Sequence, residues 1–159
     1  PGKKLLFMGS EFAQNDEWSE SAGLQWYLTE FAEHNGVQKV VAELNAIYKS
    51  QPALWQKDTN PEGFSWLVGD DGASNVLAFT RWSDDGKPLV CITNFSPVPH
   101  ENYQLPLPTA GVWREILNTD AIAFGGSGIA NDSFAVDIDT ELKRSFRIPP
   151  LSTVWLERV

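Results

Sequence analysis

The sequence predicts a mainly β protein: an antiparallel β-sandwich preceded by one β-loop-α unit. Three observations lead to this fold class. An unbroken apolar run at residues 5–8, closed by Gly9, is typical of a strand buried on both faces. Apolar residues then recur at helical spacing over residues 37–48. From residue 64 the apolar period becomes two, and short strand-like runs alternate with turn signals.

In the N-terminal unit, an acidic and aromatic loop follows the predicted strand. Residues 15–31 carry only scattered apolar anchors. We place the helix after an N-cap at Asn35, with Gln38 completing a capping box. It ends at Gln51, because a residue before proline is pushed out of helical geometry. One such unit is too small to form a sheet, so we expect the chain to begin inside a larger domain. Without that domain, we expect the apolar segment to be displaced or to drive self-association.

A polar stretch at residues 56–63 contains Pro and Gly and lacks an apolar period, so it marks the predicted boundary between domains 1–56 and 57–159. Two Asp-Asp-Gly sequences, at residues 70–72 and 84–86, predict hairpin turns, since Asp and Gly tolerate positive φ. They are read as turns and not as pairs of catalytic carboxylates. The predicted strands cover residues 64–68, 76–81, 89–95, 100–104, 112–117, 134–138, 142–148 and 153–156.

Composition excludes several classes of partner. A net charge of −9 argues against nucleic acid and anionic membranes, which attract clustered Lys and Arg. No apolar run approaches the roughly 20 residues of a membrane span. The single cysteine, Cys91, lies inside an apolar run, so we expect a buried structural thiol in a reduced, cytoplasmic setting.

A collinear series of motifs carries a family resemblance. The motifs are Lys3-Lys4-Leu5-Leu6-Phe7-Met8-Gly9-Ser10-Glu11-Phe12 with Glu17-Trp18, then Leu24-Gln25-Trp26, Leu44-Asn45-Ala46-Ile47-Tyr48, Asn94-Phe95-Ser96-Pro97, Trp113-Arg114-Glu115-Ile116 and Pro149-Pro150-Leu151-Ser152. Together they resemble the C-terminal portion of bacterial glycogen (1,4-α-glucan) branching enzymes, in the α-amylase superfamily. The resemblance implies that residues 1–56 are the last β/α unit of a catalytic (β/α)8 barrel. It implies an α-amylase-type C-terminal β-domain after them.

The resemblance also implies an activity for the parent enzyme, which would cut α-1,4-glucan (glycogen or amylose) and re-attach the piece as an α-1,6 branch. That chemistry needs two carboxyl groups about 5–5.5 Å apart. In the family they lie on earlier barrel strands, whose motifs this chain lacks. We therefore expect no catalytic residue, cofactor or metal here, and an inactive chain whose partner is the remainder of the barrel.

Three residues of the loop after the first strand are candidates for active-site support or glucan contact: Glu11, Gln14 and Trp18. Active sites of α/β barrels lie in such loops. Glu11 could orient a catalytic partner, bond a sugar hydroxyl or bridge to an arginine; we favour support, and the resemblance places it on the active-site rim. Trp18 could stack on a glucose ring or pack under the loop, and we favour packing.

Other motifs have structural interpretations. His34 and His100 are too isolated for a metal site, which needs three or four ligands, so we expect solvated side chains. The run 125–128 lacks the context of a phosphate loop and is expected to be a flexible loop. We expect mostly core positions, with one or two at the surface, for Trp55, Trp66, Trp82, Trp113 and Trp155.

The favoured function is thus the structural C-terminal domain of a branching enzyme. Alternatives are a stand-alone glucan-binding module, a purely structural domain that binds no sugar, and the C-terminal domain of a related amylase-type hydrolase or debranching enzyme.

Overall fold

The computed structural model describes residues 2–132, 134–136 and 143–159, with one long helix and eight strands in these ranges. The helix, α1, spans Ala32–Ser50. The strands are β1 (Phe64–Asp71), β2 (Val76–Trp82), β3 (Pro88–Asn94), β4 (His100–Pro106), β5 (Gly111–Asn118), β6 (Phe134–Val136), β7 (Lys143–Ile148) and β8 (Ser152–Arg158). The eight predicted strands are confirmed; residues 137, 138 and 142 of the prediction lie outside the described part.

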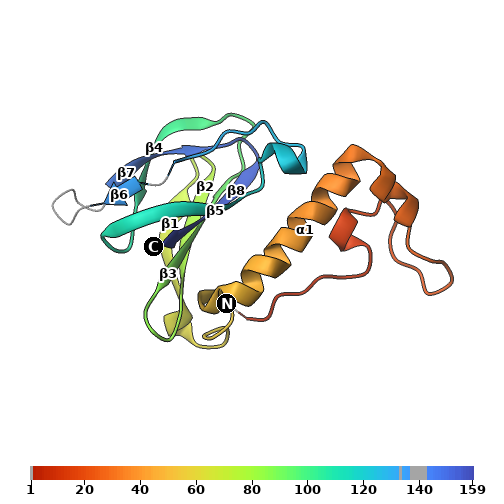
Figure 1. Ribbon diagram of the computed structural model, residues 1–159, viewed down its shortest axis with the longest axis horizontal. Coiled ribbons are helices and arrows are strands. Elements are labelled where there is room, and N and C mark those ends of the chain that lie inside the picture. The colour runs from red at the N-terminus through yellow and green to blue at the C-terminus, as the bar shows by residue number, and fades with distance from the viewer. Residues whose placement is uncertain (1, 133, 137–142) are drawn as a thin grey trace.

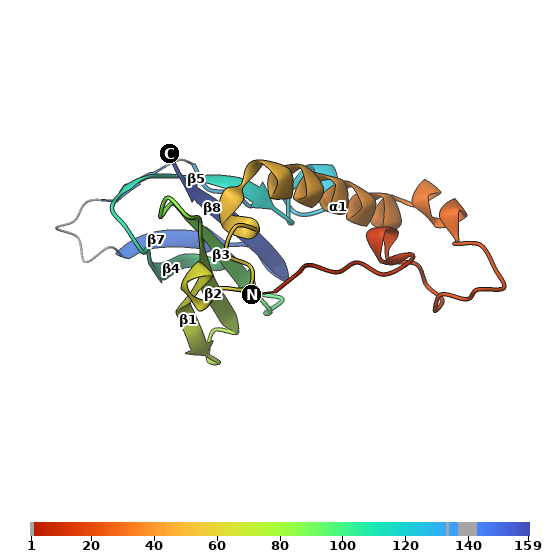
Figure 2. The same ribbon diagram turned by 90° about the horizontal axis from the view of Figure 1, so that it is seen from below.

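The strands form two antiparallel sheets that face each other (Figures 1 and 2). The larger sheet has the order β1-β2-β3-β8-β5-β6, and the smaller consists of β4 and β7. Their facing sides enclose a core of Val76, Ala78, Val90, Ile92, Leu105, Leu107, Trp113, Phe146, Ile148, Val154 and Leu156. The predicted sandwich is therefore confirmed.

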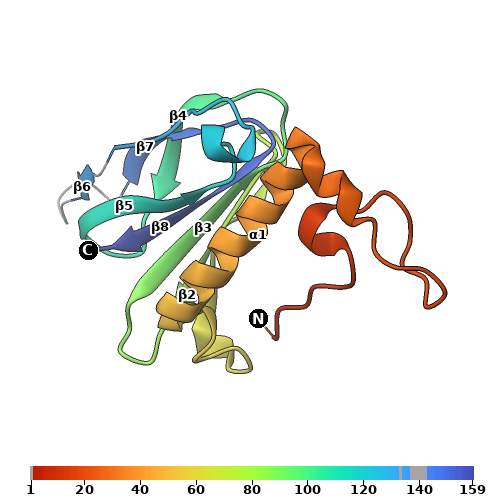
Figure 3. The ribbon, with the colours of Figure 1, turned by 45° about the vertical axis from the view of Figure 1, so that its right-hand side comes forward.

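Helix α1 packs across the opposite face of the larger sheet (Figure 3). Ile47 of α1 meets Leu89 of β3 and Leu117 of β5 in a second, smaller apolar cluster. Because successive residues of a strand point to opposite faces, β3 sends Val90 into the sandwich core and Leu89 toward the helix. The central strand is thus covered on both sides, which explains its almost unbroken apolar sequence.

The prediction of a strand at residues 5–8 is wrong. The structure assigns no strand there; residues 2–8 instead form an extended segment running beside α1, here called the N-terminal strap (Figure 2). Its apolar side chains are exposed, Leu5 at 87%. The physical reason is that a strand exists only when a neighbouring backbone completes its hydrogen bonds. The apolar pattern is typical of a buried segment, but the described residues do not bury it.

The predicted helix start is also wrong. Helix α1 begins at Ala32 after Phe31, whose backbone is extended and which makes no side-chain cap. Asn35 lies inside the first turn, where its amide donates to the Phe31 carbonyl at 2.9 Å, so no capping box forms. The predicted C-terminal end is confirmed, with Ser50 last in the helix and Gln51 as C-cap.

One glycine sets how closely α1 approaches the β-domain. At Gly36, an added Cβ would lie 2.3 Å from the carbonyl oxygen of Phe124, in the loop after β5. No real side chain tolerates that distance, so only glycine permits this crossing of helix and loop.

The prediction for Cys91 is confirmed, since the thiol is buried and free. Burial raises the pKa of the Cys91 thiol to about 12, which keeps it protonated at neutral pH. The expectation of solvated histidines is wrong. Both rings are half-buried and bond backbone carbonyls at 2.9 Å, His34 through Nδ1 to Phe12 and His100 through Nε2 to Ser74.

The loop at residues 125–128 is ordered around a carboxylate and is not the expected flexible one. Asp120 accepts bonds from the Ser127 amide at 3.0 Å and the Ser127 hydroxyl at 2.6 Å. The Asp120 carbonyl accepts the Gly128 amide at 2.8 Å. A buried aspartate after β5 therefore gives this glycine-rich sequence one conformation.

Candidate functional site

The candidate loop begins with a sharp reversal after the strap. Gly9 has a φ of +89°, and a short 3-10 helix, Ser10–Phe12, follows it. The Gln14 amide donates back to the Gly9 carbonyl at 3.0 Å, which closes the turn. A side chain at position 9 would be strained by this φ and would also lie 2.9 Å from Gln14 Cβ.

Phe12 fixes the loop to the start of α1. Its side chain is fully buried, and its ring lies 4.7 Å from that of Trp26 between centroids. The Phe12 carbonyl accepts a hydrogen bond from His34 Nδ1 on α1 at 2.9 Å. Because a carbonyl only accepts, this nitrogen carries the proton. A buried ring and a backbone bond together hold the loop against the helix.

Glu11 uses its carboxylate within the loop. Its Oε2 accepts the Gly9 amide at 2.9 Å, and the side chain is half-buried. A carboxylate that bonds a backbone N–H stabilises the local conformation. The contact made here is thus with the loop's own backbone, and it leaves the second carboxylate oxygen for another partner.

Gln14 and Trp18 also contact the protein. Gln14 Oε1 accepts the Gln25 amide at 3.0 Å, and Gln14 Nε2 donates to the Asp16 carbonyl at 2.9 Å, so this amide joins two loops. Trp18 lies edge-to-face on Phe7, with centroids 5.7 Å apart at 78°. That contact favours the packing interpretation of Trp18, although about a third of the residue stays exposed.

The three candidates share one loop near the N-terminal end of α1, away from the two sheets (Figure 1). Each is engaged in holding that loop together. In the described residues, no group of three or more His, Cys, Asp or Glu is arranged to hold a metal. No described helix is long and apolar enough to cross a membrane.

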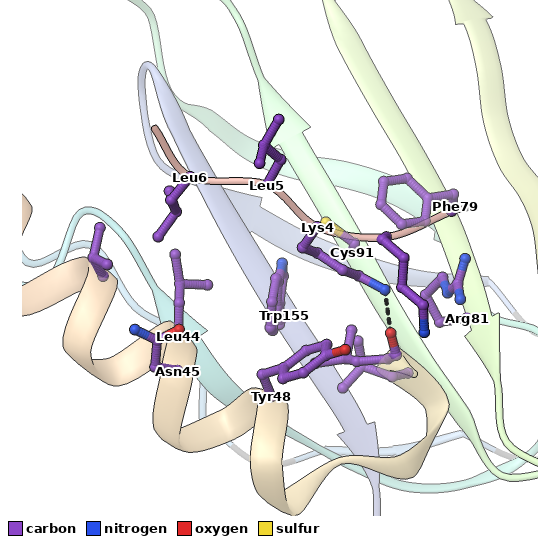
Figure 4. A pocket seen from close by; sticks show the side chains of 15 residues that line it. Lys4, Leu5, Leu6, Leu44, Asn45, Tyr48, Phe79, Arg81, Cys91 and Trp155 are labelled. Atoms are coloured by element: carbon purple, nitrogen blue, oxygen red, sulfur yellow. Dashed lines mark hydrogen bonds between the residues drawn. The ribbon is translucent and has the colours of Figure 1, made fainter. Parts of the chain in front are cut away.

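A second feature, which the sequence patterns did not predict, lies at the other end of the strap. A cavity of about 660 Å³ opens between the strap, α1 and the outer face of the larger sheet (Figure 4). Its lining is mostly apolar and includes Leu6, Leu44 and Leu89, with the cationic side chains of Lys4 and Arg81 at one end.

Those cations converge on Asp58, whose side chain is only 2% exposed. Arg81 Nη2 donates to Asp58 Oδ1 at 3.0 Å, and Lys4 Nζ donates to the same oxygen and to the Leu54 carbonyl. Lys3 Nζ lies 3.7 Å from Oδ2. Burial by itself raises the pKa of Asp58, but Lys4, Arg81 and Lys3 outweigh it and hold that pKa below its usual value.

A sequence signal for this cluster existed. Arg81 occupies a position on β2 in alternation with Leu77 and Phe79, where an apolar residue is the norm. An arginine on a covered face of a sheet demands a buried carboxylate. In the structure that carboxylate is Asp58, in the polar stretch before β1.

Comparison with known proteins gives a family for the C-terminal part of the chain and relatives for its whole length. The family described as "Alpha amylase, C-terminal all-beta domain" matches residues 66–159. The whole chain is similar to proteins named 1,4-alpha-glucan branching enzyme GlgB. It is 52% identical to that of Mesorhizobium japonicum, over 100% of this chain and 22% of the relative. For Thermobifida fusca the identity is 48%, over 98% of this chain and 22% of the relative.

The resemblance to branching enzymes is thereby confirmed, and the chain spans about a fifth of the length of these relatives. Among solved structures, the pullulanase SAP of Group B Streptococcus has a TM-score of 0.57 at 16% identity, over 86% of this chain and 18% of that one. At that identity the likeness concerns the fold alone. By its two-sheet sandwich and its match over residues 66–159, the chain belongs to the family of alpha-amylase C-terminal all-beta domains.

Proposed function

We propose that this chain is the C-terminal part of a 1,4-α-glucan branching enzyme and serves as its structural domain. The observation that carries the proposal is collinear similarity along the entire chain, at 48–52% identity, to relatives bearing that name. The parent would transfer α-1,4-glucan segments to form α-1,6 branches on glycogen or amylose. The division into residues 1–56 and 57–159 and a cytoplasmic location belong to the same proposal.

The partner of this chain is the remainder of the catalytic barrel. Supporting this are the exposed apolar side chains of Leu5, Leu6, Phe7 and Met8, each at least half exposed. Such a contiguous apolar surface marks an interaction site. In the isolated chain, the same surface is expected to pair with a second copy when the concentration is high.

In the parent, Glu11, Gln14 and Trp18 act as supports of the active-site rim. Glu11 and Gln14 hold the backbone of Gly9 and Gln25, so they fix the loop that such barrels present to substrate. Trp18 shields Phe7 and keeps one side open to solvent. The groups that form and cleave the glucosyl bond lie upstream of this chain.

A chimaera tests the proposal. The matching C-terminal segment of the Mesorhizobium japonicum relative is replaced by this chain, and branching of amylose is followed by iodine absorbance and by the proton NMR signal of α-1,6 linkages. We expect activity in the chimaera and none in the isolated chain. A folded but inactive chimaera, or branching by the isolated chain, would contradict the proposal.

A second candidate function, glucan binding by the β-domain itself, is favoured by one residue. Trp66 on the edge strand β1 is 59% exposed. Its ring is braced edge-on by Phe64 at 5.0 Å and by Phe79 at 6.3 Å between centroids. An exposed aromatic ring held in one orientation suits the apolar face of a sugar.

Affinity electrophoresis in glycogen-containing gels separates binding from a purely structural role. If Trp66 binds glucan, the wild-type chain is retarded and Trp66→Ala is not. Trp55→Ala is a matched control, because Trp55 is also exposed but lies outside the aromatic group formed by Phe64, Trp66 and Phe79. Absence of retardation in the wild-type chain would leave the β-domain a structural one.

A further inference from the structure

Arg81 lies in a buried position where an unpaired charge would be unfavourable. It is 3% exposed, and its neighbours across the sheet are Phe64 on β1 and Leu89 on β3. An unpaired guanidinium among such residues would strongly destabilise the fold. Asp58 supplies the counter-charge at 3.0 Å, and the Ala53 carbonyl accepts a longer bond from Nε at 3.4 Å. Arg81 therefore needs Asp58 for the β-domain to fold around it.

The strap also bonds the Asp58 carboxylate. Lys4 Nζ donates to Asp58 Oδ1, the oxygen that Arg81 also bonds, and to the Leu54 carbonyl. The Gly2 amide donates to the Asp58 carbonyl at 2.6 Å. The first three described residues of the strap are thus attached to residues 54–58 by backbone and side-chain bonds. Figure 4 shows Lys4 extending from the strap, with a dashed line for the hydrogen bond from its ammonium to the Leu54 carbonyl.

Helix α1 adds a third contact to this cluster. Lys4 Nζ lies 5.4 Å from the centre of the Tyr48 ring, within the range of a cation–π interaction. The Lys4 ammonium is therefore received by a carboxylate, a carbonyl and an aromatic face from three positions of the chain. Lys3 is a contrast: its side chain is 77% exposed, and its nitrogen lies 3.7 Å from Asp58 Oδ2.

Apolar packing does not explain why the strap lies where it does. Leu5, Leu6, Phe7 and Met8 are all exposed along its length. The strap is held instead at its two ends, by the Asp58 cluster at Gly2–Lys4 and by the buried Phe12 beyond Gly9. The end held by Asp58 is the one that contacts the β-domain.

We propose that Asp58 is a docking site for the strap, in which Arg81 fixes the carboxylate and Lys4 is the residue that binds it. The site joins the strap to the β-domain through charge, whereas α1 packs on the same domain through apolar side chains. It is specific for the second lysine of the Lys3-Lys4 pair, because only that ammonium bonds the buried oxygen directly. The inference does not depend on the activity of the parent enzyme.

Hydrogen exchange on the 159-residue chain tests this site. Lys4→Met keeps an unbranched side chain as far as Cε and removes the ammonium group, without changing either residue of the Asp58–Arg81 pair. Since a hydrogen bond between charged groups is stronger than one between neutral groups, we expect exchange of the Gly2 amide, which bonds the Asp58 carbonyl, to accelerate about 10-fold or more. Exchange of β3 should not change. Lys3→Met is the matched control, and its effect should stay below about 3-fold, as for an exposed ion pair.

A double mutant then identifies the partner. In the Asp58→Asn background, Lys4→Met should produce a clearly smaller acceleration than in the wild-type chain, because the bond between charged groups is already lost and only the contacts with the Leu54 carbonyl and the Tyr48 ring remain. Equal effects of Lys3→Met and Lys4→Met, or an unchanged exchange rate in Lys4→Met, would overturn the proposal. So would full additivity of Lys4→Met and Asp58→Asn. If Asp58→Asn unfolds the chain, the two single lysine variants still decide the matter.

Discussion

Two apolar runs of four residues in this chain have opposite environments. Residues 89–92, in β3, are exposed by 1, 0, 6 and 0%. Residues 5–8, in the strap, are exposed by 87, 55, 57 and 50%. Both runs are entirely apolar, so the difference comes from what surrounds each of them. Strand β3 lies between β2 and β8 and is covered on both faces, whereas the strap has no strand beside it in the described part of the chain. An apolar run indicates that a segment favours burial. Whether the segment is buried depends on the residues that surround it.

The largest expected effect sharpens this comparison with a single substitution made in both runs. Leu89→Ala removes methyl groups from a closed cluster and should lower the free energy of unfolding by about 2–5 kcal/mol. Leu5→Ala removes them from solvent and should change it by less than about 0.5 kcal/mol. Urea denaturation followed by tryptophan fluorescence measures both. A large loss in Leu5→Ala would mean that the strap is buried in solution.

The next effect concerns Glu11, in the loop after the strap. It is measured as the turnover of the active chimaera. Glu11→Gln keeps an oxygen that can accept the Gly9 amide and removes only the charge. If that charge supports the catalytic centre, turnover should fall about 100-fold with folding intact. Glu11→Ala removes the amide contact as well and serves as the companion variant. Wild-type turnover in Glu11→Gln with reduced turnover in Glu11→Ala would reduce Glu11 to a brace for the loop.

A smaller effect is expected where α1 meets the β-domain. Gly36→Ala should favour the isolated helix by about 1 kcal/mol, yet the close Phe124 carbonyl opposes the added carbon. We expect the clash to prevail, with a net loss of about 1–2 kcal/mol on thermal unfolding. Gly23→Ala is the control, because a Cβ there meets nothing within 4 Å. Stabilisation by Gly36→Ala would show that the helix moves away from the sheet at no cost.

The last effect, the pH dependence of the Asp58 cluster, is confined to acid pH. Lys4, Arg81 and Lys3 hold the pKa of Asp58 below its usual 3.8 in the folded chain. The ionised carboxylate therefore contributes stability that is present above pH 3.8 and is lost as the pH falls through the folded-state pKa. Acid titration of the wild-type chain and of Asp58→Asn, followed by circular dichroism, should differ by this step below pH 3.8. Parallel titration curves would show that ionisation of Asp58 does not contribute to the stability of the fold.

Most of the β-domain could be predicted from sequence because its strands satisfy one another locally. The Asp-Gly turns and the period of two marked β1, β2 and β3, and their partners lie within a few tens of residues. The strap could not be placed, because its apolar run predicts a buried strand and the described residues provide no strand beside it. A loop after residues 5–8 was predicted from Gly9 and the acidic residues after it, and the structure has a turn and a short 3-10 helix there; its place at an active site stays a prediction. Its internal contacts, such as Gln14 to Gln25, depend on tertiary structure that no periodicity records.

The Asp58 cluster shows a different limit. A charged residue in an apolar strand signals a buried ion pair, but the sequence does not say which of 21 acidic residues completes it. Helix α1 shows a third limit of sequence-based prediction. Its N-cap is Phe31, which has no polar side chain, although Asn35 has the side chain of a typical N-cap. Packing of Ile47 and Leu44 on the sheet stabilises the helix enough to make a cap unnecessary.

The central claim is that residues 5–8 are exposed because their partners lie outside this chain. Hydrogen exchange of these residues, compared between the isolated chain as a verified monomer and the chimaera, tests it most directly. We predict rapid exchange in the isolated monomer and protection in the chimaera that approaches that of residues 89–92. Strong protection in the isolated monomer, or rapid exchange in a folded and active chimaera, would contradict the claim.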